Sequence, residues 1–346
     1  MSRTSAFFLA ASLVCSGGLG RAEFRTLVET DFPGPGLPTG WVQEGAPWTI
    51  AQGALSPEPG SDGTILSYRP GGAGQSTLDQ KQLEARVTVM TPASRFALCT
   101  QGTYGSLAEV DGAAQVLRLY QNWSGGALPP VLTTVPLPFA LKSGGNYTLS
   151  LIRTLGASGA RVEHVVRCTL TDEASGRSVS REGFFVGGVK PWPGHMWGAP
   201  GVMVRSGRIK VRAFSYRAPY PATPRLWIGG DSFVEGDSIF AAKDRRFAQL
   251  TSAALAGDVV ISGGGGATSG DLLSRLPVDL APFSPRYCLI LIGTNDRDYA
   301  VWLGHVRQIL AYVRARGATP VLGTLAPLAG RQAFLNQANA WIRASG

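Results

Sequence analysis

The decisive stretch is Leu226-Trp227-Ile228-Gly229-Gly230-Asp231-Ser232-Phe233, an apolar run that ends in a polar turn. Two later runs repeat this pattern. Val259–Ile261 leads into the glycines Gly263–Gly266, and Cys288–Ile292 leads into Gly293-Thr294-Asn295-Asp296. Short apolar runs bounded by turn residues predict buried strands. Open α/β sheets place their chemistry beyond the carboxyl ends of the strands, so we expect the three turns to meet at one sheet edge.

The same region alternates between strand and helix signals. Strands are predicted at 226–230, 259–262, 287–292 and 320–324, and helices at about 245–256, 271–276, 300–316 and 331–344. In the third helix the apolar residues recur at helical spacing and predict a buried stripe; they are Trp302, Val306, Ile309, Leu310 and Val313. This alternation predicts a parallel sheet covered by helices on both faces.

The three turns resemble the signature blocks of the SGNH (GDSL) hydrolase family, named for its Ser, Gly, Asn and His. The resemblance covers Arg225–Gly346 and implies a flavodoxin-like α/β/α domain that cleaves esters without a cofactor or metal. It makes Ser232 the nucleophile. It also implies that the backbone N–H groups of Ser232 and Gly266 and the amide of Asn295 form the oxyanion hole.

The neighbours of these residues belong to the same signatures. The resemblance implies that Asp231 and Asp296 shape the loops, and we group them with Gly265 as substrate-binding positions. Gly264 and Gly265 replace Gly266 as the oxyanion glycine if the alignment slips.

Each block also has a purely structural interpretation. Gly-Asp-Ser alone is typical of a turn, and Asn295 after a strand is typical of a helix cap. The glycine run could instead bind phosphate, but no Gly-Lys-Ser/Thr follows and the dinucleotide-binding spacing is absent. The order and strand context of the three blocks together favour the hydrolase.

The family's fourth residue, a His in Asp-x-x-His, is not found before Gly346. The histidines present are His164, His195 and His305, of which His305 is the first choice for a substitute base. Loss of a triad base costs on the order of 10⁶ in turnover, so we expect this chain alone to be nearly inert. A truncated reading frame is the favoured explanation, and a catalytically dead hydrolase the alternative.

Residues 23–216 predict an all-β domain. Short alternating runs recur between turn residues, at 83–90, 95–101, 115–121, 147–153, 161–171, 202–205 and 207–216. Many short strands without helical periodicity favour a β-sandwich. Spaced aromatic residues and glycines in Gly40-Trp41 and Trp48-Thr49-Ile50 resemble a concanavalin- or laminin-G-like jelly roll. The resemblance suggests a carbohydrate-binding module, and Trp192 and Trp197 are candidates for sugar stacking or for loop packing. A Pro-rich linker is predicted at 217–224.

Residues 1–22 predict a secretory signal. Arg3 precedes the apolar run Ala6–Val14, which is too short to span a bilayer, and Gly20-Arg21-Ala22 provides a cleavage point. Lipidation at Cys15 ranks second. We therefore expect a secreted or periplasmic protein with no stable membrane insertion after cleavage.

Composition narrows the function classes. The 346 residues are 44% hydrophobic and 16% charged, which is typical of globular domains with large cores. The formal charge of +9 is scattered, without a Lys/Arg run, and this argues against nucleic-acid binding. Cys99, Cys168 and Cys288 leave an odd thiol, pairing of Cys99 with Cys168 stays open, and no spacing predicts a zinc site.

Two functions remain. The first is an exported acyl or acetyl esterase, with acetylated polysaccharide as a candidate substrate. The alternative is a catalytically inactive carbohydrate- or surface-binding protein that carries a remnant hydrolase domain.

Overall fold

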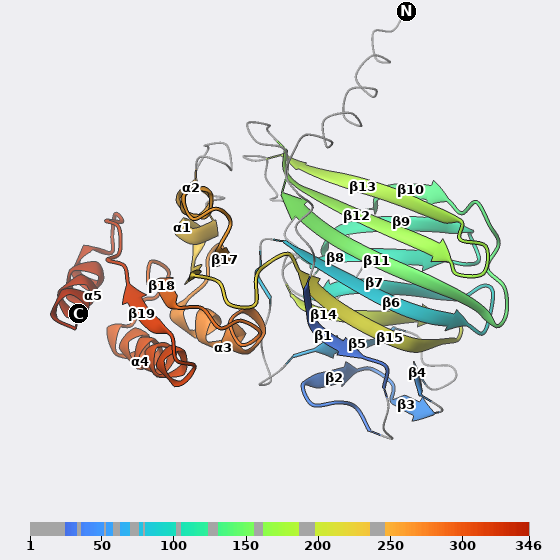
Figure 1. Cartoon of the computed structure of the whole chain (residues 1–346), viewed down its shortest axis with the longest axis horizontal. Helices are drawn as coiled ribbons and strands as arrows, with labels where there is room; N and C mark the ends of the chain where they lie inside the picture. Colours follow the sequence, from blue (N-terminus) through green and yellow to red (C-terminus); the bar gives the residue numbers. More distant parts are fainter. Residues whose placement is uncertain are drawn as a thin grey trace, which may run out of the picture.

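A computed structural model describes residues 25–32, 36–51, 53–57, 63–69, 76–78, 80–101, 105–123, 131–155, 162–186, 198–235 and 246–345. The N-terminal part consists of two antiparallel sheets and the C-terminal part of one parallel sheet with helices (Figure 1). This confirms the predicted fold class, a β-sandwich followed by an α/β/α domain. His195, Trp192, Trp197 and the predicted signal at 1–22 lie outside the described residues.

The first antiparallel sheet has eight strands in the described chain. They are β1 (Arg25–Thr30), β3 (Trp48–Ala51), β4 (Ala54–Pro57), β6 (Lys81–Val89), β11 (Gly145–Leu155), β12 (Val162–Asp172), β13 (Ser178–Val186) and β15 (Ile209–Ala218). Their order is β13-β12-β11-β6-β15-β4-β3, and β1 also pairs with β15. In β12, Val166, Cys168 and Leu170 are fully buried while Arg167 is exposed, which is the period of two expected of a half-buried strand.

The second antiparallel sheet has seven strands among the described residues. They are β2 (Trp41–Glu44), β5 (Thr64–Tyr68), β7 (Arg95–Gln101), β8 (Gly105–Asp111), β9 (Val116–Trp123), β10 (Val131–Pro136) and β14 (Ala199–Ser206). Their order is β10-β9-β8-β7-β14-β5-β2. Residues from both sheets, such as Leu98 of β7 and Leu149 of β11, belong to one apolar core, as in a sandwich.

The parallel sheet contains β16 (Leu226–Gly230), β17 (Val259–Gly263), β18 (Tyr287–Leu291) and β19 (Thr319–Leu322). Its order is β17-β16-β18-β19 and every described pair is parallel. Counted within this domain the order is 2-1-3-4, the start of the flavodoxin-like arrangement. The first strand therefore lies between the second and the third, and the order in which successive strands are added to the sheet reverses beside it.

The helices of this domain are α1 (Ser232–Glu235), α2 (Phe247–Ala254), α3 (Ser269–Asp279), α4 (Tyr299–Ala315) and α5 (Gln332–Ala344). The stripe predicted for α4 is buried throughout. α3 is longer than predicted, because Thr268 and Asp271 form a capping box at its start and the helix continues past Pro277.

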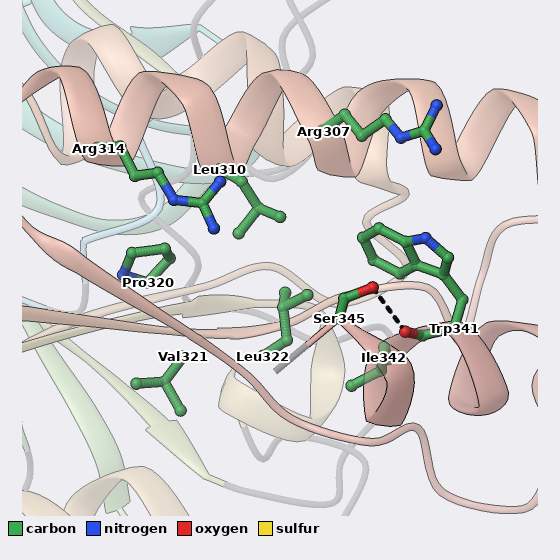
Figure 2. Close-up of a pocket in the computed structure, with 9 residues that line it drawn as sticks. All are labelled: Arg307, Leu310, Arg314, Pro320, Val321, Leu322, Trp341, Ile342 and Ser345. Carbon is green, nitrogen blue, oxygen red and sulfur yellow. Dashed lines mark hydrogen bonds between the residues drawn. The ribbon is translucent and has the colours of Figure 1, made fainter.

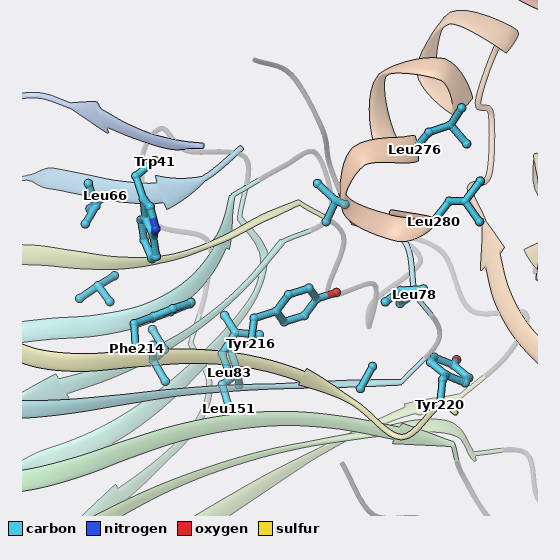
Figure 3. Packing of buried hydrophobic residues seen from close by; sticks show 14 of the residues in the cluster. Trp41, Leu66, Leu78, Leu83, Leu151, Phe214, Tyr216, Tyr220, Leu276 and Leu280 are labelled. Carbon is cyan, nitrogen blue, oxygen red and sulfur yellow. The ribbon is translucent and has the colours of Figure 1, made fainter. Parts of the chain in front are cut away.

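The linker predicted at 217–224 is packed against its surroundings. β15 continues to Ala218, and Tyr220, which is 7% exposed, makes an edge-to-face contact with Phe283 of the hydrolase part. Figure 3 shows Tyr220 and Tyr216 in the same apolar cluster as Leu276 of α3 and Leu280, which follows that helix. One core therefore runs from the sandwich into the α/β part, and the exact domain bounds stay a prediction.

Among the described residues, Cys99, Cys168 and Cys288 are buried free thiols, so the disulfide left open between Cys99 and Cys168 is not formed. Cys99 lies in β7 of the second sheet and Cys168 in β12 of the first. Burial raises the pKa of Cys168 and of Cys288 to about 12, so both are protonated at neutral pH.

A groove of about 590 Å³ runs along the outer edge of β19, between α4 and α5 (Figure 2). It is lined by Arg307, Leu310, Arg314, Pro320, Val321, Leu322, Trp341, Ile342 and Ser345. Within the described ranges, no helix is long and apolar enough to cross a bilayer, and no cluster of His, Cys, Asp or Glu could hold a metal ion.

The end of β17 can accommodate only a glycine. A Cβ on Gly263 would lie 2.3 Å from the backbone nitrogen of Glu235 in α1. We expect Gly263→Ala to lower the free energy of unfolding by about 1–3 kcal/mol, because α1 must move. Thermal or urea unfolding measures this change in the free energy of unfolding. Gly304→Ala is the control: it lies inside α4 with nothing within 4 Å of the added Cβ, and should instead stabilise the protein by up to about 1 kcal/mol. Equal effects of the two changes would contradict this packing.

Candidate active site

The three predicted turns lie at the same edge of the parallel sheet and are bonded to one another. β17 and β18 both pair with β16, so their carboxyl ends flank Gly230. One residue beyond the ladder, the Gly264 N–H donates to the Gly230 carbonyl (3.0 Å) and the Asp231 N–H donates to the Leu291 carbonyl (3.3 Å). This is the switch point where open α/β sheets bind ligands.

Ser232 is the first residue of α1 and is half-buried. Asp231 holds the turn in place, because its Oδ1 accepts from the Phe233 N–H (3.0 Å) and its carbonyl accepts from the N–H groups of Val234 and Glu235. The Ser232 hydroxyl forms no hydrogen bond with any residue that the structure describes. It is therefore available for chemistry.

The glycine loop forms a β-turn from Gly264 to Ala267, closed by the Ala267 N–H on the Gly264 carbonyl (3.0 Å). Gly266 has a φ of +74° at the third position, as a type II turn requires. The Gly264 N–H is already engaged with Gly230 and cannot serve an oxyanion. The N–H groups of Gly265 and Gly266 have no acceptor in the described part of the chain, which keeps the first-choice Gly266 available.

Asn295 joins this loop to the third turn. Its Nδ2 donates to the Ala267 carbonyl, next to Gly266, at 3.0 Å. A side-chain amide nitrogen carries two hydrogens, so the second N–H of Asn295 Nδ2 can still donate. Asn295 is half-buried and does not titrate. The structure thus brings Asn295 beside the Gly266 turn, as the sequence predicted.

Asp296 faces the protein interior and is 6% exposed. Its carboxylate accepts from the Ser269 N–H (2.9 Å) and from the Ser269 hydroxyl (2.5 Å) at the start of α3. The Arg331 guanidinium donates to the carbonyls of Thr294 and Asp296. These contacts hold the Asn295 turn in place. A direct role of Asp231, Gly265 or Asp296 in binding substrate stays a prediction.

Ser269, Arg275 and Arg331 were not predicted to be site residues. Arg275 is 2% exposed and its Nη2 donates to the Gly230 carbonyl (2.5 Å), two residues before Ser232. Burial lowers the pKa of this guanidinium, an effect that the charge of Asp279 opposes. Ser269 and Arg275 lie on α3 and Arg331 immediately precedes α5, and only the fold brings these polar side chains to the turns.

His305, the first choice for a substitute base, faces a different serine. Its Nδ1 lies 3.1 Å from the Ser269 hydroxyl, at the contact between α3 and α4. His164 is in β12 of the sandwich. No histidine side chain in the described part of the molecule bonds to the Ser232 hydroxyl.

A hollow of about 460 Å³ borders the Asn295 turn. It is lined by Asp296, Arg297, Gly330, Arg331, Ala333 and Phe334. The larger groove of Figure 2 lies instead at the far edge strand, β19, and is separate from these turns.

Residues 229–346 match the model of the GDSL-like Lipase/Acylhydrolase family. The C-terminal part of the chain is thus similar to this hydrolase family over residues 229–346. The match confirms the resemblance drawn from the Ser232, Gly266 and Asn295 blocks. No curated protein matches the sequence.

Three solved structures are similar to parts of this chain. A protein with a galectin-like fold from Bacillus subtilis is 11% identical, with a TM-score of 0.41, over 57% of this chain and 98% of its own. A GDSL-like lipase from Bacteroides thetaiotaomicron is 20% identical, with a TM-score of 0.30, over 35% of this chain and 63% of its own. The acetyl xylan esterase AlAXEase is 16% identical, with a TM-score of 0.31, over 34% of this chain and 70% of its own. At such identities the likeness concerns the fold alone.

Burial raises the pKa of the Asp231 carboxyl above its ordinary value, against the opposing hydrogen bonds from Phe233 and Thr294. A carboxyl with a raised folded-state pKa stabilises the fold below its unfolded pKa, and this contribution is lost as the pH rises through the folded value. Asparagine caps a helix equally well and does not titrate. We therefore expect the melting temperature of Asp231→Asn minus that of wild type to increase as the pH rises from about 3.5 to about 7. Calorimetry across this range measures the difference, and a constant or falling difference would show that burial does not dominate at Asp231.

Proposed function

We propose that the protein is an exported serine ester hydrolase that removes acyl groups, with acetylated carbohydrate as its substrate class. One observation carries the proposal. The Ser232 hydroxyl has no hydrogen-bond partner among the described residues, and Ser232 follows the strand at the switch point. The turns of Gly266 and Asn295 lie next to the Ser232 turn and are hydrogen-bonded to each other. The family of the C-terminal domain supports the same chemistry.

The reaction follows from these groups. The Ser232 oxygen attacks the ester carbonyl carbon while its proton passes to a base, and the carbonyl oxygen becomes an oxyanion. The N–H of Gly266 and the free N–H of the Asn295 amide would donate to this oxyanion, together with the Ser232 N–H. The alcohol then leaves, and water hydrolyses the acyl-enzyme.

The base is the component that the described residues lack. His305 bonds to Ser269, and Asp231 and Asp296 are committed to holding their turns. A proton acceptor at Ser232 must therefore come from a group outside the described residues or from solution. This same observation favours a second candidate function, a carbohydrate- or surface-binding protein whose hydrolase domain is inactive.

The substrate class and the location rest on the other parts of the chain. A β-sandwich beside an esterase domain suits a polymeric carbohydrate, which the sandwich would hold while the α/β part removes acyl groups. The apolar run and cleavage point in residues 1–22 support export.

Labelling by a fluorophosphonate probe tests the nucleophile. Because the described residues provide no base, we expect the full chain to label only slowly at Ser232, Ser232→Ala to lose the label, and Ser175→Ala, which removes an exposed serine of the sandwich, to keep it. Added imidazole should speed labelling by about tenfold or more, because general bases contribute at least this much. Mass spectrometry of the labelled peptide gives the site. A folded chain that stays unlabelled even with imidazole would favour the binding protein.

Kinetics of Asn295→Ala test the oxyanion donor. Loss of one such donor typically costs about 10²–10³ in turnover, so kcat for an acetyl ester should fall by this factor. KM should change little, because the hydrogen bond strengthens only in the transition state. Asn336→Ala, an exposed position on α5, is the control. A loss divided equally between kcat and KM would argue against this role.

A further inference from the structure

A short segment of the sandwich part lies inside the α/β part. Leu78 forms an antiparallel bridge with Ser262 of β17, on the edge of that strand opposite β16. Leu78 is fully buried in the cluster that contains Leu276 of α3 and Leu280, just after that helix (Figure 3). Ser76, two residues earlier, bonds through its hydroxyl to the hydroxyl of Tyr216 in β15 (2.6 Å). The segment 76–78 therefore connects the two parts directly.

Thr77, between these residues, bonds to a buried carboxylate of the hydrolase domain. Its N–H and its hydroxyl donate to Oδ2 of Asp279 at 2.8 and 3.0 Å, and the hydroxyl of Ser262 donates to the same oxygen at 2.8 Å. Asp279 is fully buried at the end of α3. A buried carboxylate needs such donors, since an unpaired charge in the interior is costly.

The carboxylate lies beside the buried Arg275, one helical turn earlier. The Arg275 Nε lies 3.8 Å from Asp279 Oδ2 and donates to the Ser262 hydroxyl (3.3 Å). Its Nη2 donates to the carbonyls of Ser262 (3.1 Å) and Gly230 (2.5 Å). Gly230 immediately precedes the Asp231–Ser232 turn. A continuous set of buried polar contacts thus runs from Thr77 of the sandwich part to the strand end that carries Ser232.

We propose that Thr77, Asp279 and Arg275 are positioning residues, through which the sandwich part fixes the Ser232 turn. The inference rests on the proposed function of Ser232 for its catalytic meaning. Thr77 orients the Asp279 carboxylate, the carboxylate orients the guanidinium, and the guanidinium holds the Gly230 carbonyl. The sandwich is then part of the structural support of the active site as well as a module beside it.

Domain packing alone offers a competing explanation, in which these contacts only join the two parts. The two explanations predict that removing one hydrogen bond destabilises different regions of the protein. A joining role predicts that loosening the contact affects the whole junction. A positioning role predicts a local effect at the Ser232 turn, reported by the amides of Asp231, Val234 and Glu235, which bond to Leu291 and Asp231.

Hydrogen–deuterium exchange of the full chain tests this. Thr77→Val keeps the size of the side chain and removes the hydroxyl. We expect exchange at Asp231, Val234 and Glu235 to become about tenfold faster, as for loss of one hydrogen bond to a buried charge. Exchange in the middle of α4 and in β11 should stay as in wild type. Thr77→Ser restores the hydroxyl and should restore slow exchange.

Thr88→Val is the matched control. Thr88 lies in the same part of the chain, on β6, and its hydroxyl bonds to Asn146 at 2.7 Å on the surface. Thr88→Val should leave amide exchange at the Ser232 turn as in wild type. Unchanged exchange at the turn in Thr77→Val, or the same acceleration in α4, β11 and Thr88→Val, would overturn the proposal.

The hydrogen–deuterium exchange measurement does not require catalytic activity. Repeating the exchange in a Ser232→Ala background should reproduce the difference between Thr77→Val and Thr77→Ser. If Ser232 proves not to be the nucleophile, the labelling experiment fails while this difference remains. If positioning is wrong, labelling at Ser232 survives and the difference disappears.

Discussion

The carbonyl oxygen of Gly230 is the atom on which the arrangement of the site depends. It accepts from the Gly264 N–H at 3.0 Å and from the Arg275 guanidinium at 2.5 Å. A carbonyl oxygen has two lone pairs, and these two donors use both. The first bond fixes the glycine turn against the Ser232 turn. The second bond ties the same strand end to a buried charge of α3.

The junction with the sandwich follows from that buried charge. Arg275 and Asp279 are almost completely removed from water, so the hydrogen bonds that Asp279 Oδ2 accepts offset part of the cost of burying the pair, while Asp279 Oδ1 has no hydrogen-bond partner among the described residues. Thr77 provides two of the three donors to Asp279 Oδ2. The α/β part alone would leave this carboxylate with fewer partners. This explains physically why one apolar core and one polar network cross the junction together.

Local patterns in the sequence predicted the framework well. The bounds of β16 and the buried stripe of α4 followed from apolar runs and helical spacing, and the three turns were located by their position after strands. Prediction failed where burial depends on distant partners. β8 was missed because Glu109 is fully buried in it through ion pairs with Arg95 and Arg118, each at 3.0 Å. The contact of Thr77 with Asp279 joins residues 202 positions apart, and no local pattern reports it.

The central claim is that the Ser232 hydroxyl faces the donors of the Gly266 and Asn295 turns. A crystal structure of the Ser232 phosphonate adduct tests it most directly, since the phosphoryl oxygen occupies the place of the oxyanion. We expect this oxygen at about 2.7–3.1 Å from both the Gly266 nitrogen and the Asn295 Nδ2. An adduct whose phosphoryl oxygen points away from both donors, with neither in hydrogen-bond reach, would contradict it.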